Sequence, residues 1–413
     1  MDFEDSPEEA AFRAEVKTWL DANAKPRTGK REINADDMEN GAANQMAASK
    51  AWQKTKAKAG YARITWPKGQ GGIGGTPMQS IIFGQEEGKY DVANGGPFAI
   101  GLGMCIPTLM AYGSEDAKKR HVWPAVQGDE IWCQLFSEPA GGSDVAGLRT
   151  KAEKNGDTWT INGSKIWTTG AQFSDFGILL TRTDPNVPKH KGLTMFYLSM
   201  KSPGVEIRPI KQASGGSGFN QIFFTDVKIP DSQRLGEVGQ GWQVALTTLM
   251  HERLAVGGGA GGGLDVPQLM SLARTLELED GPAIKNASVR EKIADWYVKS
   301  AGLRYTTMRT MTALSRGQQP GPEASIAKLV VASKLQDLSA FAMDLEAESG
   351  ILQGDDAPMH GMFQGGWMSS PGLRIAGGTD EIMRNIIAER VLGLPQDVRV
   401  DKDVPFNKLP VSR

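Results

Sequence analysis

The fold is decided by a stretch that begins Cys133-Gln-Leu-Phe-Ser-Glu-Pro-Ala-Gly-Gly-Ser-Asp144 and ends Lys165-Ile-Trp-Thr-Thr-Gly170. Between its two ends lies Asn162-Gly163, a pair that favours a two-residue β-hairpin turn. β-branched and aromatic residues flank this pair on both sides, as strand residues would. We therefore expect a hairpin that brings a hydroxyl- and glycine-rich turn close to the end of a Trp-Thr-Thr strand.

Aromatic and hydroxyl side chains gather at the two ends of this stretch. Phe136 and Trp167 offer apolar plates, and Ser137, Thr168 and Thr169 offer short hydroxyl donors. A flat heteroaromatic ligand is held by contacts of these two kinds. The stretch therefore predicts a site for a planar ring.

The composition is that of an ordinary globular protein. The 413 residues are 40% hydrophobic and 23% charged, which is enough chain for two or three packed units. A formal net charge of -2 gives no electrostatic footprint for nucleic acid or an anionic membrane. No apolar run is long enough to span a bilayer. We expect neither a nucleic-acid partner nor a membrane partner.

Cysteine usage and the first residues bear on the compartment. The chain has two cysteines, Cys105 and Cys133, which is too few for a disulfide framework and suits a reducing environment. It opens Met-Asp-Phe-Glu-Asp, which is acidic where a secretory or organellar leader would be basic. These features indicate a cytoplasmic protein.

Hydrophobic periodicity divides the chain into helical, β and again helical parts. Helical spacing covers 8–23, 46–59, 77–90, 98–112 and 114–127, with a polar loop over 24–45. From Glu130 to about Pro230 the period becomes two, with short strands at 176–182, 193–198, 205–210 and 221–229. Helical spacing then lasts to Leu394, where Gly393 and Pro395 form a stop signal. The pattern predicts an α+β protein with an N-terminal helical domain (1–129), a middle β-sandwich or barrel (130–238), a C-terminal helical bundle (239–395) and a polar tail (396–413).

Two known sequence motifs, one for dinucleotide binding and one for zinc proteases, are matched only in part of their residues or outside their usual structural context. Gly69-x-Gly71-x-x-Gly74 follows a proline, and Gly257-x-Gly259-x-x-Gly262 follows a helical pattern, whereas a dinucleotide fingerprint follows a buried strand. His251-Glu252 lacks the second histidine of a zinc-protease motif, and the four histidines are scattered. We expect no nicotinamide site and no metal.

Glu252 lies in a helical pattern, 241–256, that is apolar on most sides. Helical spacing places Ala245, Leu249 and Val256 on the same face. Glutamate is rarely buried without a partner, so this carboxylate either pairs with a distant Lys or Arg or serves chemistry. Both interpretations stay open at this point.

A second glycine-rich turn precedes the last helical pattern. It reads Gly377-Gly378-Thr379-Asp380-Glu381, with Thr379 or Asp380 as N-cap. Free backbone N–H groups at a helix start are a seat for phosphate, although a plainly capped helix would have the same sequence.

Taken together and in this order, these segments resemble the acyl-CoA dehydrogenase family. The resemblance also rests on Phe224-Thr-Asp-Val-Lys-Ile-Pro230, on Gly239-Gln-Gly-Trp242 and on Glu252-Arg253. It covers nearly the whole chain and implies FAD as cofactor. It implies ring contacts from Leu135, Phe136, Ser137, Trp167 and Thr169, contacts to the FAD diphosphate and adenosine from Gly378, Thr379 and Glu381, and a contact from Arg274 to a diphosphate across a subunit interface.

The resemblance also implies the chemistry. The family oxidises an acyl-CoA thioester to the trans-2-enoyl thioester, with a carboxylate that removes the alpha proton. Ser143 resembles the residue that meets the CoA ester, and Arg253 resembles one that faces the CoA. Most members carry the base directly before the Gly-Thr pair, where this chain has Gly377 on the substrate side and no carboxylate. The isovaleryl- and long-chain-like branch places it on the helix after the β domain, and Glu252 fits that placement.

One departure from the family concerns assembly. The family's Gln-x-x-Gly-Gly segment, which helps to hold the FAD of a neighbouring subunit, is poorly matched at Gly350-Ile-Leu-Gln-Gly354. Similar departures occur in heteromeric dehydrogenases of bacterial steroid and side-chain degradation. We expect a homo- or hetero-tetramer that passes electrons to electron-transferring flavoprotein or another acceptor. An acyl-CoA oxidase and a non-catalytic subunit are the alternatives.

Overall fold

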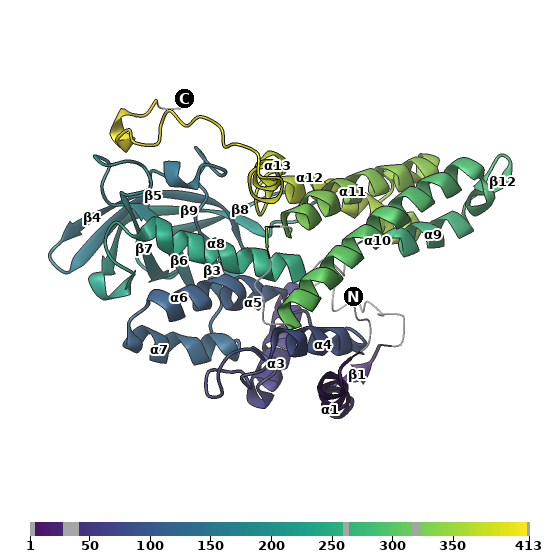
Figure 1. The fold of residues 1–413 in the computed structure, drawn as a ribbon, viewed down its shortest axis with the longest axis horizontal. Coiled ribbons are helices and arrows are strands. Elements are labelled where there is room, and N and C mark those ends of the chain that lie inside the picture. Colours follow the sequence, from purple (N-terminus) through teal and green to yellow (C-terminus); the bar gives the residue numbers. More distant parts are fainter. Residues whose placement is uncertain (1–4, 28–40, 259–263, 316–320, 323, 411–413) are drawn as a thin grey trace. The chain divides into compact units, whose positions relative to one another are not determined.

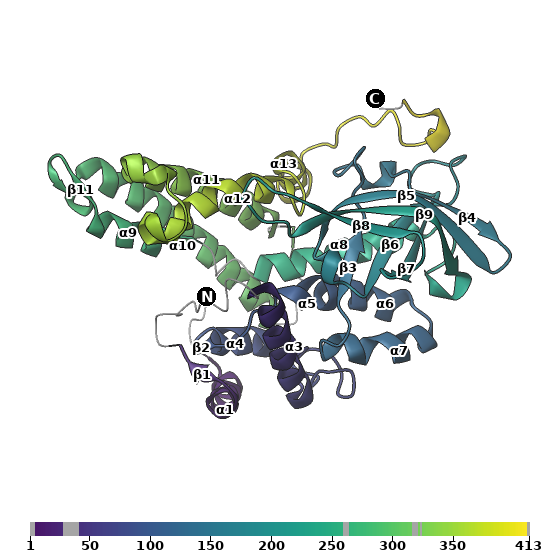
Figure 2. The same ribbon diagram turned by 180° about the vertical axis from the view of Figure 1, so that it is seen from behind.

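The computed structural model describes residues 5–27, 41–258, 264–315, 321–322 and 324–410. The chain forms two compact units, which we call the sheet unit and the bundle unit. The sheet unit holds residues 2–211, 217–255 and 398–413, and the bundle unit holds 212–216 and 256–397. Figures 1 and 2 show the elements of each unit from two sides.

The starts of two helices in the sheet unit are determined by capping residues at their N-termini. The helix α1 (Pro7–Asn23) begins at Ser6, which forms a capping box with Glu9, and α4 (Pro77–Glu87) begins in the same way at Thr76 with Gln79. Phe12, Val16 and Leu20 of α1 are buried at helical spacing. Both helices were predicted from the sequence and are confirmed. The other helical segments here are α3 (Gly41–Ala59), α5 (Gly96–Ile100), a π-helix (Gly101–Cys105), α6 (Ile106–Tyr112) and α7 (Glu115–Val126).

The predicted polar loop over 24–45 needs a correction. The helix α3 already begins at Gly41, and a two-residue strand, β1 (Lys25–Pro26), pairs with β2 (Tyr90–Asp91). Alanine is frequent in 41–49, and its high helix propensity extends the helix where apolar periodicity is weak. Residues 28–40 lie outside the described residues.

The β part of the sheet unit is one curved, eight-stranded sheet. Its strand order is β10-β7-β6-β4-β5-β9-β8, and β3 pairs with β6 in parallel. The predicted strands of the middle domain are confirmed. The strands are β3 (Trp132–Leu135), β4 (Lys151–Asn155), β5 (Thr158–Thr169), β6 (Phe176–Arg182), β7 (Leu193–Ser199), β8 (Val205–Ile210), β9 (Phe219–Pro230) and β10 (Arg234–Leu235).

Alternate side chains of the sheet enter two different cores. Ile178 and Leu180 of β6 pack in one core with residues of α6 and α7 and with Val244 of α8 (Gly241–Gly258). Leu179 enters the other core. This core consists of Trp159 and further side chains from the strands of the sheet. The helices α6 and α8 run along the same face of the sheet in both views (Figures 1 and 2).

The hairpin predicted at Asn162-Gly163 is wrong. Both residues lie inside β5, at a register shift in its pairing with β9, and the chain turns instead at Gly156, between β4 and β5. Gly163 (φ 146°) is required because a Cβ there would lie 2.7 Å from Cα of Thr150. The glycine thus serves a bulge with a close backbone approach rather than a turn.

The bundle unit is helical with its own core. Leu269 and Leu272, on the buried side of a strongly amphipathic helix, pack with Trp296, Leu338 and Phe363. Its helices are α9 (Val266–Thr275), α10 (Ala287–Ser315), α11 (Ala324–Leu345), α12 (Met362–Ile375), α13 (Asp380–Ile386) and a π-helix (Ile387–Val391); β11 (Glu277–Leu278) and β12 (Gly281–Pro282) form a small hairpin. The helical, β and helical order confirms the predicted α+β fold, whereas the exact domain boundaries stay a prediction.

Candidate active site

The two ends of the deciding stretch lie side by side in the sheet unit. The N–H of Ile166 donates to the carbonyl oxygen of Ser137 at 2.9 Å. Nζ of Lys165 donates to the carbonyl oxygen of Phe136 at 3.0 Å. The segment 135–137 after β3 therefore runs against the last residues of β5, as the predicted ring site requires.

A buried ion pair fixes this contact. Nζ of Lys165 lies 2.8 Å from Oε1 of Glu138, and both side chains are buried. The Glu138 carboxylate also accepts from the N–H groups of Arg149 and Thr150, at 2.7 and 2.9 Å. Burial opposes ionisation of this carboxyl, but the ammonium and the donated hydrogen bonds outweigh it and lower the pKa of Glu138. Sequence reasoning missed both residues of the pair.

Trp167 is held in an unusual backbone conformation. Its φ is 60°, in the left-handed region that side chains other than glycine rarely adopt, and it lies at a register shift between β5 and β9. The indole is 56% exposed and meets the Phe219 ring edge-on at 6.1 Å. Bulges often re-aim a side chain beside a functional site, and this one presents an indole to the surface.

Residues with hydroxyl side chains neighbour Trp167: Thr168 and Thr169 follow it in β5, and Ser137 accepts a backbone hydrogen bond from Ile166, the residue before it. Thr169 is exposed and Ser137 is half-buried. Thr168 is buried, and its Oγ1 has no hydrogen-bond partner among the described residues. Its carbonyl oxygen accepts from Nδ2 of Asn220 at 3.1 Å, which ties the strand end to β9. Asn220 is a further residue that the sequence did not indicate.

Leu135 and Phe136 are placed differently from the other predicted ring contacts. The Leu135 side chain is in the core inside the sheet, and the Phe136 side chain is in the core against the helices. Each is nearly fully buried, so neither side chain is presented at the surface. A ligand at this position would meet these two residues through their main chain.

Ser143 is exposed on a loop, 139–148, that is closed at its base. Glu138 and Gly141 exchange two backbone hydrogen bonds, of 3.1 and 3.0 Å. The hydrogen bonds that the N–H groups of Arg149 and Thr150 donate to the Glu138 carboxylate join the two ends of the loop. The neighbouring residue Asp144 accepts from Nζ of Lys189 at 2.9 Å. The predicted thioester contact is therefore on a supported loop.

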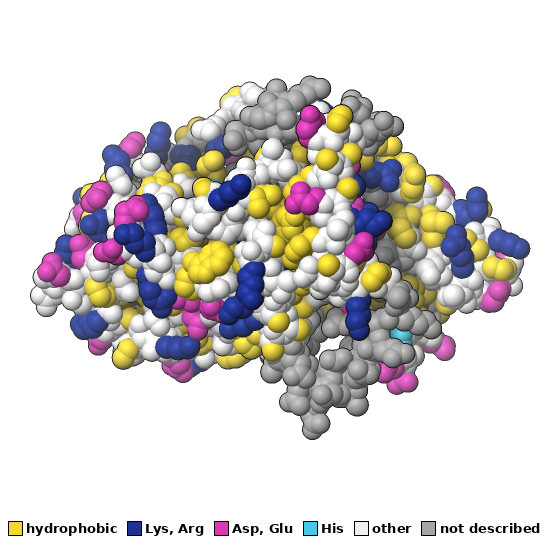
Figure 3. Space-filling model, turned by 90° about the horizontal axis from the view of Figure 1, so that it is seen from below, with side chains coloured by type: hydrophobic (Ala, Val, Ile, Leu, Met, Phe, Trp, Pro, Cys, Tyr) yellow, Lys and Arg dark blue, Asp and Glu magenta, His cyan; other side chains and the backbone are white. Residues whose placement is uncertain are grey.

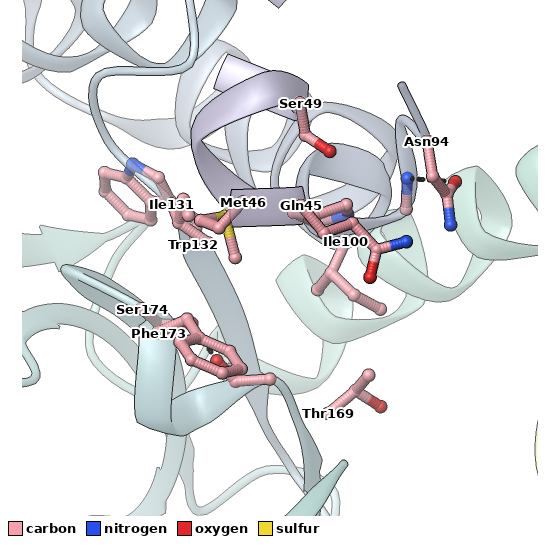
Figure 4. Close-up of a pocket in the computed structure, with 13 residues that line it drawn as sticks. Gln45, Met46, Ser49, Asn94, Ile100, Ile131, Trp132, Thr169, Phe173 and Ser174 are labelled. Carbon is pink, nitrogen blue, oxygen red and sulfur yellow. Dashed lines mark hydrogen bonds between the residues drawn. The ribbon is translucent and has the colours of Figure 1, made fainter. Parts of the chain in front are cut away.

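A cavity of about 210 Å³ opens beside Thr169 within the sheet unit. Figure 4 shows residues of α3 and of the segment 94–100 on one side, with Thr169, Phe173 and Ser174 across from them. The Ser49 hydroxyl is buried and has no hydrogen-bond partner among the described residues. None of the described residues that line the cavity is charged. The lining combines apolar side chains with neutral polar ones, so it suits a mainly apolar group that carries neutral polar atoms.

The predicted base lies on α8, the helix that crosses the sheet. Thr248 of α8 bonds to Thr108 at 2.9 Å, and Thr247 bonds to Tyr112 at 3.0 Å, which fixes the helix on α6. The side chains of Glu252 and Arg253 are outside the described residues, so their positions stay a prediction. The preceding His251 is half-buried, and burial together with the charge of Arg63 lowers its pKa.

The remaining predicted residues lie in the bundle unit. Gly377 (φ 67°) and Gly378 (φ 98°) form a left-handed turn, and Thr379 caps α13 by accepting from the N–H of Ile382 at 3.3 Å. A Cβ on Gly378 would lie 2.4 Å from Cε of Met383. The exposed Glu381 has a lowered pKa because its own backbone N–H and the Thr379 hydroxyl donate to it. Arg274 is exposed in the last turn of α9.

Three side chains hold this turn: Asp380, which the sequence indicated only as a candidate N-cap, and Lys328 and Arg374, which it did not indicate. Lys328 donates to the carbonyl oxygens of Arg374, at 3.2 Å, and Gly378. The buried Asp380 accepts from Nε of Arg374 at 2.7 Å. The turn is therefore fixed from α11 and α12, independently of any ligand.

The surface is mixed in charge. On the face shown in Figure 3, Lys and Arg side chains alternate with Asp and Glu. Within the described ranges, no helix is both long and apolar enough to cross a membrane, and no three His, Cys, Asp or Glu side chains are grouped as metal ligands.

Comparisons with known proteins agree with the fold and with the order of the segments. The chain is 33% identical over 391 residues to acyl-CoA dehydrogenase IpdE1 of Mycobacterium tuberculosis, which covers 94% of this chain and 98% of the relative. It is 32% identical over 344 residues to acyl-CoA dehydrogenase FadE34 of the same organism, which is 83% of this chain. The chain spans 46% of the length of FadE34, about half.

The family models divide the chain into three. The acyl-CoA dehydrogenase N-terminal, middle and C-terminal domains match residues 6–129, 133–227 and 239–392. The chain has the three-domain fold of this class of oxidoreductase. It belongs to the acyl-CoA dehydrogenase family, as the sequence motifs predicted.

Solved structures share the fold over nearly the whole chain. The ChsE4-ChsE5 complex from Mycobacterium tuberculosis contains a chain that is 25% identical with a TM-score of 0.76, and the match covers 96% of this chain and all of that one. The Tcur3481-Tcur3483 steroid ACAD has a TM-score of 0.77 at 24% identity, over 96% of this chain and all of that one. At 24% identity, the second match supports only the similarity of fold.

Proposed function

We propose that this protein is an FAD-dependent acyl-CoA dehydrogenase that converts an acyl-CoA thioester to its trans-2-enoyl thioester with Glu252 as the base. The observation that carries the proposal is Trp167, an exposed indole in a strained left-handed bulge, with Thr169 two residues further along β5 and Ser137 bonded through its backbone to Ile166. Strain at a bulge that presents an aromatic plate is typical of a ligand site. Family membership supplies the class of ligand.

The chemistry of the side chains fits FAD. The Trp167 indole suits stacking on an isoalloxazine, and Ser137, Thr169 and the unpaired Oγ1 of Thr168 are donors and acceptors for its polar edge. Leu135 and Phe136 would contribute main-chain contacts. In the bundle unit, Gly378, Thr379 and Glu381 would meet the diphosphate and adenosine part, and Arg274 would meet the diphosphate in a neighbouring subunit.

Three of the predicted residues would meet the substrate. Ser143 would meet the thioester, Arg253 would face the CoA, and Gly377 would leave space where other members carry their base. The cavity beside Thr169 would take the acyl group, since its lining is largely apolar. Small residues at 257–263, of which 259–263 lie outside the described residues, would leave further room for a branched or bulky acyl group.

The base must remove a weakly acidic alpha proton. Burial in the apolar pattern of α8 would raise the pKa of Glu252 and make it a stronger base once water is excluded. Hydrogen bonds to the thioester carbonyl would stabilise the negative charge that develops there. When bound, FAD accepts the hydride equivalent that leaves the beta carbon.

Relatives support a proposal for partners. The chains most similar in fold include a named two-component complex, ChsE4-ChsE5, which favours a hetero-tetramer or a homo-tetramer over a monomer. Electron-transferring flavoprotein or another acceptor would reoxidise the flavin. The titles of two solved structures of a steroid ACAD and the largely apolar cavity favour steroid-derived or fatty acyl thioesters. Two buried free thiols suit a cytoplasmic setting.

A subunit of a heteromeric enzyme is the second candidate, since the Gln-x-x-Gly-Gly segment is poorly matched. Such a subunit would be colourless alone and would gain flavin with a partner. A further alternative, an acyl-CoA oxidase, would form peroxide rapidly in air.

The test is anaerobic flavin bleaching by a panel of straight, branched and steroid-derived thioesters. We expect the purified protein to be yellow and to bleach with at least one of them. Glu252→Gln should stay yellow and lose the bleaching, whereas Glu237→Gln, an exposed change of the same kind, should bleach normally. Normal bleaching by Glu252→Gln would assign the base to another residue.

A further inference from the structure

The C-terminal tail packs on the sheet unit instead of extending from it. The N–H of Phe406 donates to the carbonyl oxygen of Val187, and the N–H of Asn407 donates to that of Pro185, both at 2.9 Å. Pro405 pairs with Pro188 as an isolated bridge. Tail residues 401–409 therefore lie along the segment 184–191, which links β6 to β7. The sequence predicted only a polar tail.

The tail places a carboxylate on a buried lysine. Nζ of Lys189 lies 2.6 Å from Oδ2 of Asp401 and 2.9 Å from Oδ2 of Asp144, and the Lys189 side chain is only 7% exposed. Asp144 is the residue after Ser143. A single ammonium thus joins the tail to the loop 139–148.

The tail also covers the cation that holds the other half of that loop. Arg182 is buried at the end of β6 and donates to the carbonyl oxygens of Ala146 at 2.5 Å and Leu148 at 3.3 Å. It also donates to that of Lys189 at 2.9 Å. The guanidinium carbon of Arg182 lies over the Phe406 ring, 3.7 Å from the ring centroid.

We infer that the C-terminal tail is a positioning element for the loop that carries Ser143, and that Asp401 and Phe406 act on acyl-CoA binding through Lys189 and Arg182. The inference rests on the proposed function, because it takes Ser143 as a thioester contact. Neither tail residue touches the substrate in this account. Without the Asp401 carboxylate, Lys189 has one partner fewer and Asp144 is held less firmly.

The consequence belongs to substrate binding rather than to flavin binding. Glu138 and Lys165 hold the base of the loop and the ring segments, and no described tail residue forms a hydrogen bond or an ion pair with either of them. A displacement of the loop by the order of 1 Å is enough to lower productive binding strongly. We therefore expect loss of the tail contacts to raise KM and leave kcat and the flavin content nearly unchanged.

The experiment compares Asp401→Asn with Asp403→Asn in the full-length flavoprotein. Both changes remove one carboxylate from the tail, but Asp403 is exposed and lies on neither cation. With the thioester that bleaches the wild type fastest, we expect Asp401→Asn to raise KM by roughly tenfold. The Asp403→Asn control should keep the wild-type KM, and Asp401→Glu should recover part of the loss.

The possible outcomes separate this inference from the proposed function. If no thioester of the panel bleaches the wild type, the proposed function fails before any variant is compared. If the wild type bleaches and Asp401→Asn matches Asp403→Asn in KM, the tail does not position the loop. If Asp401→Asn instead loses flavin or lowers kcat as much as it raises KM, the tail supports the whole unit and the inference is wrong. The variant Phe406→Leu should repeat the rise in KM through Arg182.

Discussion

Nζ of Lys165 lies 2.8 Å from Oε1 of Glu138, with the lysine side chain fully buried and the glutamate 6% exposed. The pair joins the last residues of β5 to the segment after β3, and so holds together the two segments proposed to contact the flavin ring. The same carboxylate closes the base of the Ser143 loop. One ion pair therefore organises both the ring side and the thioester side.

Removal of one partner should be costly. In Lys165→Met the Glu138 carboxylate stays buried without its cation, and breaking a buried pair in this way costs about 3–5 kcal/mol. Unfolding in urea should show a loss of this size. The double variant Lys165→Met/Glu138→Gln should recover part of it, because the uncompensated charge is gone. Lys201→Met, which removes an exposed lysine from its pair with Asp175, is the matched control and should change little. A Lys165→Met protein as stable as this control would contradict the account.

The pair also gives the stability a dependence on acid. The folded pKa of Glu138 lies below the 4.5 of an ordinary glutamate, so as the pH falls the unfolded chain takes up the proton first. Its stabilising contribution is therefore complete above pH 4.5 and is lost as the pH falls through the folded pKa. Between about pH 5 and pH 3, Glu138→Gln should lose less of its free energy of unfolding than the wild type. Equal slopes of that free energy against pH would show that Glu138 titrates alike in both states.

Most of the fold could be predicted because its signals are local. Ser6 with Glu9 and Thr76 with Gln79 are capping boxes that can be read within four residues. Strands β5, β8 and β9 alternate in burial over much of their length, whereas β6 and β7 are buried on both faces. The prediction of a hairpin at Asn162-Gly163 was wrong because an Asn-Gly pair is compatible both with a tight turn and with a β-bulge. The close approach of Thr150, thirteen residues before Gly163 by their numbers, decides between them, and no local pattern contains it.

The site roles stay predictions, and the structure adds supporting residues that the sequence did not indicate. Trp167, Thr169 and Ser143 are exposed, as expected of ligand contacts, and the family motifs mark them. Lys165 could have been predicted to be buried, because it lies an even number of residues from Trp159 and Ile161 and so faces the same side of the strand. A buried lysine requires an anionic partner. Lys189 and Asp401 are 212 residues apart in sequence, by their numbers, and only the path of the tail brings them together.

The cavity beside Thr169 should govern which acyl groups are accepted. Ile100→Trp would fill part of the 210 Å³ with an indole. We expect KM for bulky or ring-bearing thioesters to rise by roughly tenfold or more, with a smaller effect on short straight chains. Initial rates of anaerobic bleaching across the panel measure this contrast. Val298→Trp, at an exposed position of α10, is the control. An equal rise for short and bulky thioesters would mean that the cavity does not hold the acyl group.

Trp167 allows the backbone strain and the indole contact to be separated. Trp167→Ala and Trp167→Gly both remove the indole, so both should retain FAD poorly in gel filtration, while Trp167→Phe should retain much of it. The two differ in the backbone, because φ of 60° costs a residue with a Cβ roughly 1–2 kcal/mol that glycine avoids. In the flavin-free proteins, Trp167→Gly should therefore unfold at a higher urea concentration than Trp167→Ala, against the usual destabilising effect of glycine in a strand. If Trp167→Gly were the less stable of the two, the left-handed conformation at this bulge would not be a source of strain, and if either variant kept its flavin as the wild type does, the indole would not be part of the ring site.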